Sequence, residues 1–151
     1  MIPGHKIMAI FGFCDIRNFT DATEVLEADV MVFVNEIAAI CHKEVYEHLG
    51  SPNKNVGDAF LLVWKFRQED INVTETEEQA ILELIPSSRA SQIADLAVLS
   101  FIKMVAEITR SETLQKYKNN KLLKQRIPNY LGVKMGFGLH FGWAIEGPIG
   151  S

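Results

Sequence analysis

The chain has 151 residues and a mass of 17.0 kDa, which is the size of a single domain. It is 48% hydrophobic and 23% charged, so it has enough apolar side chains for a core and is not a disordered tail. Its formal net charge of −4 argues against a nucleic-acid binder whose affinity comes from neutralising phosphates.

The sequence shows no signal for a membrane span or for export. The longest apolar runs, such as residues 59–64, are far too short to cross a bilayer. The N-terminus lacks the apolar region and cleavage site of a signal peptide. Two cysteines, Cys14 and Cys41, are too few for a disulfide framework and indicate buried thiols in a reducing compartment.

A strand and a long helix are predicted at the start of the chain. Residues 7–16 are mostly apolar and suit a strand that is buried on both faces. Thr20 and Asp21 offer N-cap chemistry, and Glu24 completes a capping-box pattern with Asp21. Apolar residues then recur at helical spacing over residues 28–49, which predicts a helix there.

A hairpin and an acidic segment follow. Two short runs, 54–56 and 59–66, flank Gly57 and Asp58, which is typical of a tight turn between strands. Residues 67–88 are interpreted as an acidic loop insertion with a turn of helix at most, because they contain Glu69, Asp70, Glu75, Glu77, Glu78 and Glu83.

The second half is predicted to form a helix, a basic connecting segment and a strand. Apolar residues at helical spacing mark a helix over residues 90–110. Residues 111–130 form a basic connecting segment, for which a solvated helix end is favoured over a phosphate or regulatory contact. Its basic residues are Lys116, Lys118, Lys121, Lys124 and Arg126.

The last strand has one apolar face and one glycine-rich face. Its apolar face consists of Val133, Met135, Phe137, Leu139, Phe141 and Trp143. A glycine face lets a helix, a partner chain or a nucleotide approach the backbone, and we expect a helix. The order strand, helix, hairpin, helix, strand predicts an α/β sandwich. The turn sequence at 147–151 has no closing element after it, so we expect a fragment of a domain.

Asp15 and Asp58 are the strongest candidates for chemistry. Asp15 ends an apolar strand and Asp58 lies in a hairpin turn, so both reach the same sheet edge if their strands are neighbours. Two close carboxylates repel each other unless a cation neutralises them. Hard oxygen ligands of this kind suit Mg²⁺ or Mn²⁺. The alternative for each residue alone is a turn or cap aspartate.

The segment between Asp15 and the first helix is a candidate anion site. Backbone N–H groups at a helix N-terminus bind phosphate groups well, and residues 16–20 occupy that position. The candidate anion site therefore lies beside the candidate metal site.

Three blocks of sequence, at residues 13–20, 54–61 and 133–151, extend these observations. The first reads FCDIRNFT, the second KNVGDAFL, and the third contains GFGLHFG and GPIGS. They resemble, in the same order, the F-x-D-I-x-x-F-T signature, the K-x-x-G-D-A-x-L hairpin, and the G-I-H-x-G strand with its G-N-I-G-S turn of class III adenylate/guanylate cyclase catalytic domains. Pro148 and Leu139 depart from that pattern.

The resemblance implies a ferredoxin-like nucleotide cyclase fold, truncated at its C-terminus, which works as a dimer. The reaction is attack of the ribose 3′-oxygen on the α-phosphate of ATP, which gives 3′,5′-cyclic AMP and pyrophosphate. By this likeness Asp15 and Asp58 hold two Mg²⁺ or Mn²⁺ ions with the carbonyl of Ile16. The backbone around Phe19 and Thr20 holds the triphosphate.

Lys54 occupies the position where adenylate cyclases carry a base-reading lysine and guanylate cyclases a glutamate. A lysine donates to a ring nitrogen of adenine, so the resemblance favours ATP over GTP. Without the resemblance, an exposed hairpin lysine is the simpler interpretation.

The resemblance also implies that half of the site is missing. The chain ends before the second base-reading residue and before the Asn and Arg that the partner subunit supplies, so we expect little activity from this piece alone. The expected location is the cytoplasm, in intracellular signalling. Two alternatives remain: a non-catalytic regulatory or dimerisation module, and a guanylate cyclase.

Overall fold

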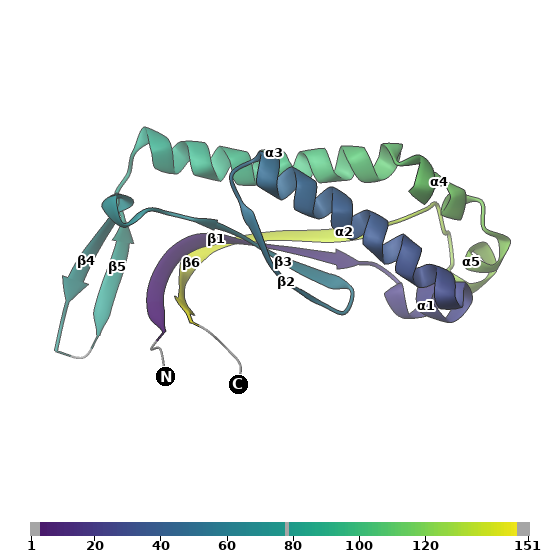
Figure 1. Ribbon diagram of the computed structural model, residues 1–151, viewed down its shortest axis with the longest axis horizontal. Helices are drawn as coiled ribbons and strands as arrows, with labels where there is room; N and C mark the ends of the chain where they lie inside the picture. Colours follow the sequence, from purple (N-terminus) through teal and green to yellow (C-terminus); the bar gives the residue numbers. More distant parts are fainter. Residues whose placement is uncertain (1–3, 78, 148–151) are drawn as a thin grey trace.

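The computed structural model describes residues 4–77 and 79–147. Figure 1 shows an elongated molecule in which two long helices lie along one side of a sheet. Its strands and α-helices are β1 (His5–Ile16), α1 (Phe19–Leu26), α2 (Val30–Glu47), β2 (Ser51–Val56), β3 (Ala59–Lys65), β4 (Ile71–Glu75), β5 (Ala80–Leu84), α3 (Ser88–Arg110), α4 (Glu112–Lys118), α5 (Lys121–Arg126) and β6 (Met135–Glu146).

The main sheet is antiparallel and has the strand order β2-β3-β1-β6. The central strand β1 pairs with β6 from His5 to Ile16, and with β3 from Ala9 to Asp15. Helices α1 and α2 connect β1 to β2, and α3 to α5 follow the second hairpin and lead into β6. This arrangement confirms the predicted ferredoxin-like α/β fold.

One face of the sheet carries the core. The other, which we call the open face, is exposed around Phe13, although Ala9 and Val63 on it are buried. Alternate residues of β1 are buried beneath the helices: Met8, Ile10, Cys14 and Ile16. Gly12 belongs to the same face, where the rings of Phe101 and Trp64 leave no space for a side chain. On the other face Phe13 is 52% exposed.

The predicted buried thiols are confirmed. Cys14 and Cys41 are both free and fully buried, and the sulfur of Cys14 lies 4.0 Å from that of Met104. A hydrogen bond with Cys41, together with burial, raises the pKa of the Cys14 thiol. The Cys14 thiol is therefore held in the protonated form, which is the unreactive one.

The predicted cap at Thr20 and Asp21 is wrong, although the helix over 28–49 is confirmed as α2. Helix α1 begins at Phe19, after Asn18, which adopts a left-handed conformation (φ 58°) and makes no side-chain cap. Asp21 and Glu24 bind Arg126 of α5 instead, at 2.7 Å and 2.5 Å. A tertiary ion pair has therefore replaced the local capping box.

The acidic segment 67–88 contains a hairpin rather than a solvated loop. Strands β4 and β5 pair from Ile71↔Leu84 to Glu75↔Ala80. Ile71, Leu82 and Leu84 pack against the core, and the Nζ of Lys6 donates to the carbonyl of Ala80 at 2.8 Å. The high acid content of this segment concealed its apolar face.

The strand β6 and the helix α3 are confirmed, but no helix among residues 4–77 and 79–147 covers the glycine face of β6, where we expected one. Gly136 and Gly138 pair with Asp15 and Phe13, so they lie on the open face of the sheet. The apolar face of β6 lies on the helix side, where Met135 and Phe137 pack against the core. The turn at 147–151 lies outside the described residues, apart from Gly147.

The basic segment 111–130 forms two short helices, α4 and α5, in place of a single helix end.

No helix within residues 4–77 and 79–147 has the length and hydropathy that a bilayer crossing requires.

Candidate active site

The sheet brings the backbones of the two candidate aspartates together. Asp15 stands near the end of β1, and Asp58 immediately precedes β3, the neighbouring strand. Asp15 pairs with Ala59, and the N–H of Ile16 donates to the carbonyl of Asp58 at 3.1 Å. The backbones of the two acids therefore stand at the same sheet edge, because their strands are neighbours. Their role as metal ligands stays a prediction.

The turn that carries Asp58 is tight. Gly57 has φ +61°, a left-handed conformation that glycine adopts without strain. This conformation reverses the chain between Val56 of β2 and Ala59 of β3. Asp58 is therefore held directly before Ala59, the first residue of β3, and Ala59 pairs with Asp15.

Arg17 is a charged neighbour of the site that the sequence analysis did not single out. Its Nη1 lies 3.4 Å from the Oδ1 of Asp15, and the two side chains are 61% and 44% exposed. An ion pair this exposed to solvent contributes about 1 kcal/mol or less. It neutralises part of the charge of Asp15 without locking the carboxylate in place.

The first turn of α1 lies directly after the site. The backbone N–H of Arg17 donates to the carbonyl of Lys134 at 2.9 Å, which ties this segment to the start of β6. The carbonyl of Asn18 accepts the first helical bond, from the N–H of Ala22 at 3.0 Å. The N–H groups of Phe19 and Thr20 belong to the first turn, where a helix leaves its donors without intrahelical partners. This position suits an anion.

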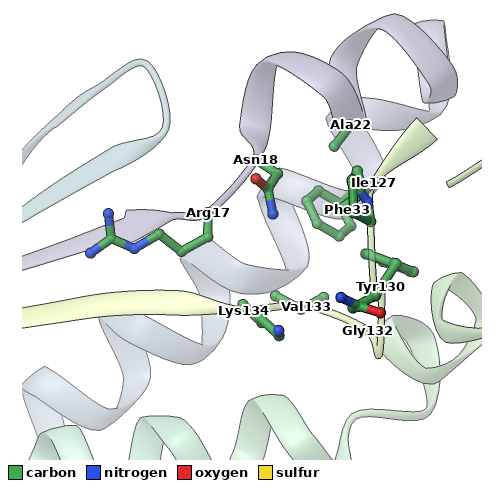
Figure 2. Close-up of a pocket in the computed structure, with 11 residues that line it drawn as sticks. Arg17, Asn18, Ala22, Phe33, Ile127, Tyr130, Gly132, Val133 and Lys134 are labelled. Atoms are coloured by element: carbon green, nitrogen blue, oxygen red, sulfur yellow. The ribbon is translucent and has the colours of Figure 1, made fainter. Parts of the chain in front are cut away.

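A small cavity of about 20 Å³ lies behind this turn, between Asn18, Phe33 and Tyr130 (Figure 2). It has room for about one water molecule. The hydroxyl of Tyr130 is buried and has no hydrogen-bond partner among the described residues. Burial, together with the neighbouring Tyr117, raises the pKa of Tyr130. The cavity is too small for a nucleotide.

Lys54 lies on β2, exposed to solvent and paired with Leu61 of β3. A register shift between Pro52 and Lys54 interrupts the ladder just before it. Leu61 in turn pairs with Phe13, which belongs to the open face. Among residues 4–77 and 79–147 no carboxylate forms a salt bridge with Lys54.

The donors at this sheet edge fit a hard divalent cation. Two carboxylates and the carbonyl of Ile16 are all oxygen ligands, which Mg²⁺ and Mn²⁺ prefer. The described part of the chain contains no cluster of three or more His, Cys, Asp or Glu side chains that could hold a metal by itself. A site of this kind therefore needs further oxygens from water or a bound phosphate, as is usual for Mg²⁺.

The sequence matches no protein-family profile, and no curated protein matches it either. Solved structures do match. The chain is 22% identical to a bacterial light-regulated adenylyl cyclase (TM-score 0.66), 21% to the adenylyl cyclase CyaB from P. aeruginosa (0.65), and 20% to the guanylyl cyclase Cya2 (0.66).

These alignments cover 99–100% of this chain, but only 35%, 63% and 61% of the three solved chains. The fold is that of class III adenylyl and guanylyl cyclase catalytic domains, which confirms, at the level of the fold, the resemblance found in the three sequence blocks. The chain spans about two thirds or less of the length of these solved structures.

Proposed function

We propose that this chain is the metal- and triphosphate-binding part of an adenylyl cyclase catalytic domain, which converts ATP to 3′,5′-cyclic AMP and pyrophosphate in the cytoplasm. The observation that carries the proposal is the 3.1 Å bond from the N–H of Ile16 to the carbonyl of Asp58. Through it Asp15, Ile16 and Asp58 gather at one sheet edge, beside the first turn of α1.

In the proposed reaction the ribose 3′-oxygen forms a bond to the α-phosphorus, and the bond from that phosphorus to pyrophosphate breaks. Bound Mg²⁺ or Mn²⁺ would supply activation of the attacking oxygen and charge stabilisation of the leaving phosphate. Asp15 and Asp58 would hold these ions with the Ile16 carbonyl. The N–H groups of Phe19 and Thr20 would bind the triphosphate oxygens.

A second cyclase domain is the proposed partner. Phe13 and Val56 expose large apolar side chains on the open face of the sheet, beside Asp15. Exposed apolar groups gathered on one face are typical of a surface that another protein covers. A homodimer or a related cyclase domain would supply the remaining site residues.

The first test is whether Mn²⁺ stabilises the chain. A ligand that binds only the native state adds about 2.7 kcal/mol at one hundred times its Kd. For a chain of this size that is a rise in Tm of roughly 5–10 °C. We expect this rise in differential scanning calorimetry with Mn²⁺ and ATP, and its reversal by a chelator. No shift under any of these conditions would favour a non-catalytic cyclase-like module.

A guanylyl cyclase is the second candidate, because the chain is 20% identical to Cya2, close to the 22% and 21% for the adenylyl cyclases. Lys54 distinguishes the two. In a longer chain that turns over nucleotide, we expect Lys54→Glu to shift the ATP/GTP ratio of kcat/KM toward GTP by roughly 10–100-fold, the value of a charged hydrogen bond. The exposed Lys103→Glu on α3 serves as the control and should leave the ratio unchanged. A GTP preference before substitution would contradict the assignment to ATP.

A further inference from the structure

The guanidinium of Arg17 occupies the space that the missing side chain of Gly136 leaves on β6. A Cβ added at Gly136 would stand 2.6 Å from Cζ and 2.8 Å from Nε of Arg17, so the side chain fits only because residue 136 has none. We call this space the Gly136 notch. Figure 2 shows Arg17 extending away from the cavity of Asn18 and Tyr130, along the strands.

The Gly136 notch lies directly beside Asp15. Gly136 is the cross-strand partner of Asp15 in the β1–β6 ladder, so both residues belong to the open face. In the notch, the Nη1 of Arg17 lies 3.4 Å from the Oδ1 of Asp15. Among residues 4–77 and 79–147 no other cation forms a salt bridge with this carboxylate. The missing side chain at 136 thus determines which cation Asp15 faces.

We propose that Arg17 competes with the divalent cation for Asp15 and, once displaced, binds the triphosphate. The inference rests on the proposed function. A guanidinium and a metal ion repel each other at one carboxylate, so binding of one disfavours the other. Arg17 stands immediately before Asn18, the N-cap of α1. The released guanidinium is therefore close to the anion position, and its planar fork suits phosphate oxygens.

Two substitutions separate the two parts of this role. Arg17→Gln removes the charge. Gly136→Ala fills the notch and moves the guanidinium away from Asp15 while keeping it in the protein, because the clash is with the end of a flexible side chain. Gly138→Ala is the matched control, since it adds the same methyl group to the same face of β6 with nothing within 4 Å.

The first measurement is Mn²⁺ affinity of the 151-residue chain without nucleotide, from the electron paramagnetic resonance signal of free Mn²⁺ at low salt. We expect Arg17→Gln and Gly136→Ala to tighten the Kd roughly two- to fivefold, the value of an exposed ion pair. Gly138→Ala should match the wild type. High salt should reduce the difference, because it screens exposed charges.

The second measurement adds a non-hydrolysable ATP analogue with saturating Mn²⁺. Arg17→Gln should bind the analogue more weakly than the wild type, whereas Gly136→Ala should not. Equal Mn²⁺ affinity in all four proteins, or unchanged analogue binding in Arg17→Gln, overturns the inference and leaves the proposed function intact. Absence of Mn²⁺ binding in the wild type overturns the proposed function itself. The exposed Arg17→Gln keeps the test valid if Gly136→Ala fails to fold.

Discussion

Trp64→Ala is expected to lower the free energy of unfolding by about 3–5 kcal/mol, the range for removing a large aromatic ring from a core. Trp64 lies on β3 and is 1% exposed. Its Nε1 donates to the carbonyl of His48 at 3.0 Å, and its ring packs edge-on against Phe101 at a centroid distance of 6.0 Å. One side chain thus joins β3 to the end of α2 and to α3.

Two glycines lie in close contact with the ring of Trp64. A Cβ on Gly12 would lie 2.9 Å from Cζ3 of Trp64, and one on Gly50 would lie 2.6 Å from Cε2. Neither glycine has a side chain that can move into the space after the ring is removed. The cavity therefore persists, which is the condition under which large-to-small substitutions cost most.

Trp143→Ala is the matched control. Trp143 is 58% exposed, and its main polar contact is the ammonium of Lys6, 4.8 Å from the ring centroid. Its loss should cost about 1 kcal/mol or less. Urea unfolding followed by far-UV circular dichroism compares the two variants without relying on tryptophan fluorescence. Equal losses would show that Trp64 is not the centre of the core.

The parts of the fold that sequence analysis located are those with strong local signals. The apolar run of β1, the helical spacing of α2 and α3, and the Gly57-Asp58 turn each depend on neighbouring residues only. Such signals persist in the folded chain because the core needs the same apolar faces. Such signals located the strand end of Asp15 and the turn of Asp58, whereas the pairing of β1 with β3 that brings them together was only a condition of the prediction.

The parts that the sequence concealed depend on contacts between distant segments. The local sequence predicts that Asp21 caps a helix, but in the structure Asp21 forms an ion pair with Arg126 of α5. The β4–β5 hairpin was not predicted, because its acidic residues suggest a loop. Its apolar face packs against the hydrophobic core. The pairing of Arg17 with the Gly136 notch requires the exact register of β1 and β6, which no local pattern specifies.

The face of β6 that the helices cover could also not be assigned from alternation alone. A period of two gives two faces but does not say which one the helices cover. Here Met135 and Phe137 lie on the helix side, so Gly136 and Gly138 fall on the open side with Asp15. The glycines therefore leave space beside the candidate site, in place of space for a helix.

Asp15→Asn and Asp58→Asn are each expected to weaken Mn²⁺ binding by roughly 100-fold or more, since even residues that only support metal ligands contribute about 10–100-fold. Asparagine keeps the shape and one oxygen of the side chain but removes the charge, so the fold should survive. Asp95→Asn on α3, which is exposed and equal in charge change, should leave the affinity unchanged.

The double variant tests whether the two carboxylates act on the same ions. If Asp15 and Asp58 share a site at the edge joined by the Ile16–Asp58 bond, the two losses in binding free energy will not add, because removing either one already dismantles the site. Isothermal titration calorimetry of the wild type, both single variants and the double variant gives this coupling. Strictly additive losses would mean that each aspartate acts alone, and the shared two-ion site would then have to be abandoned.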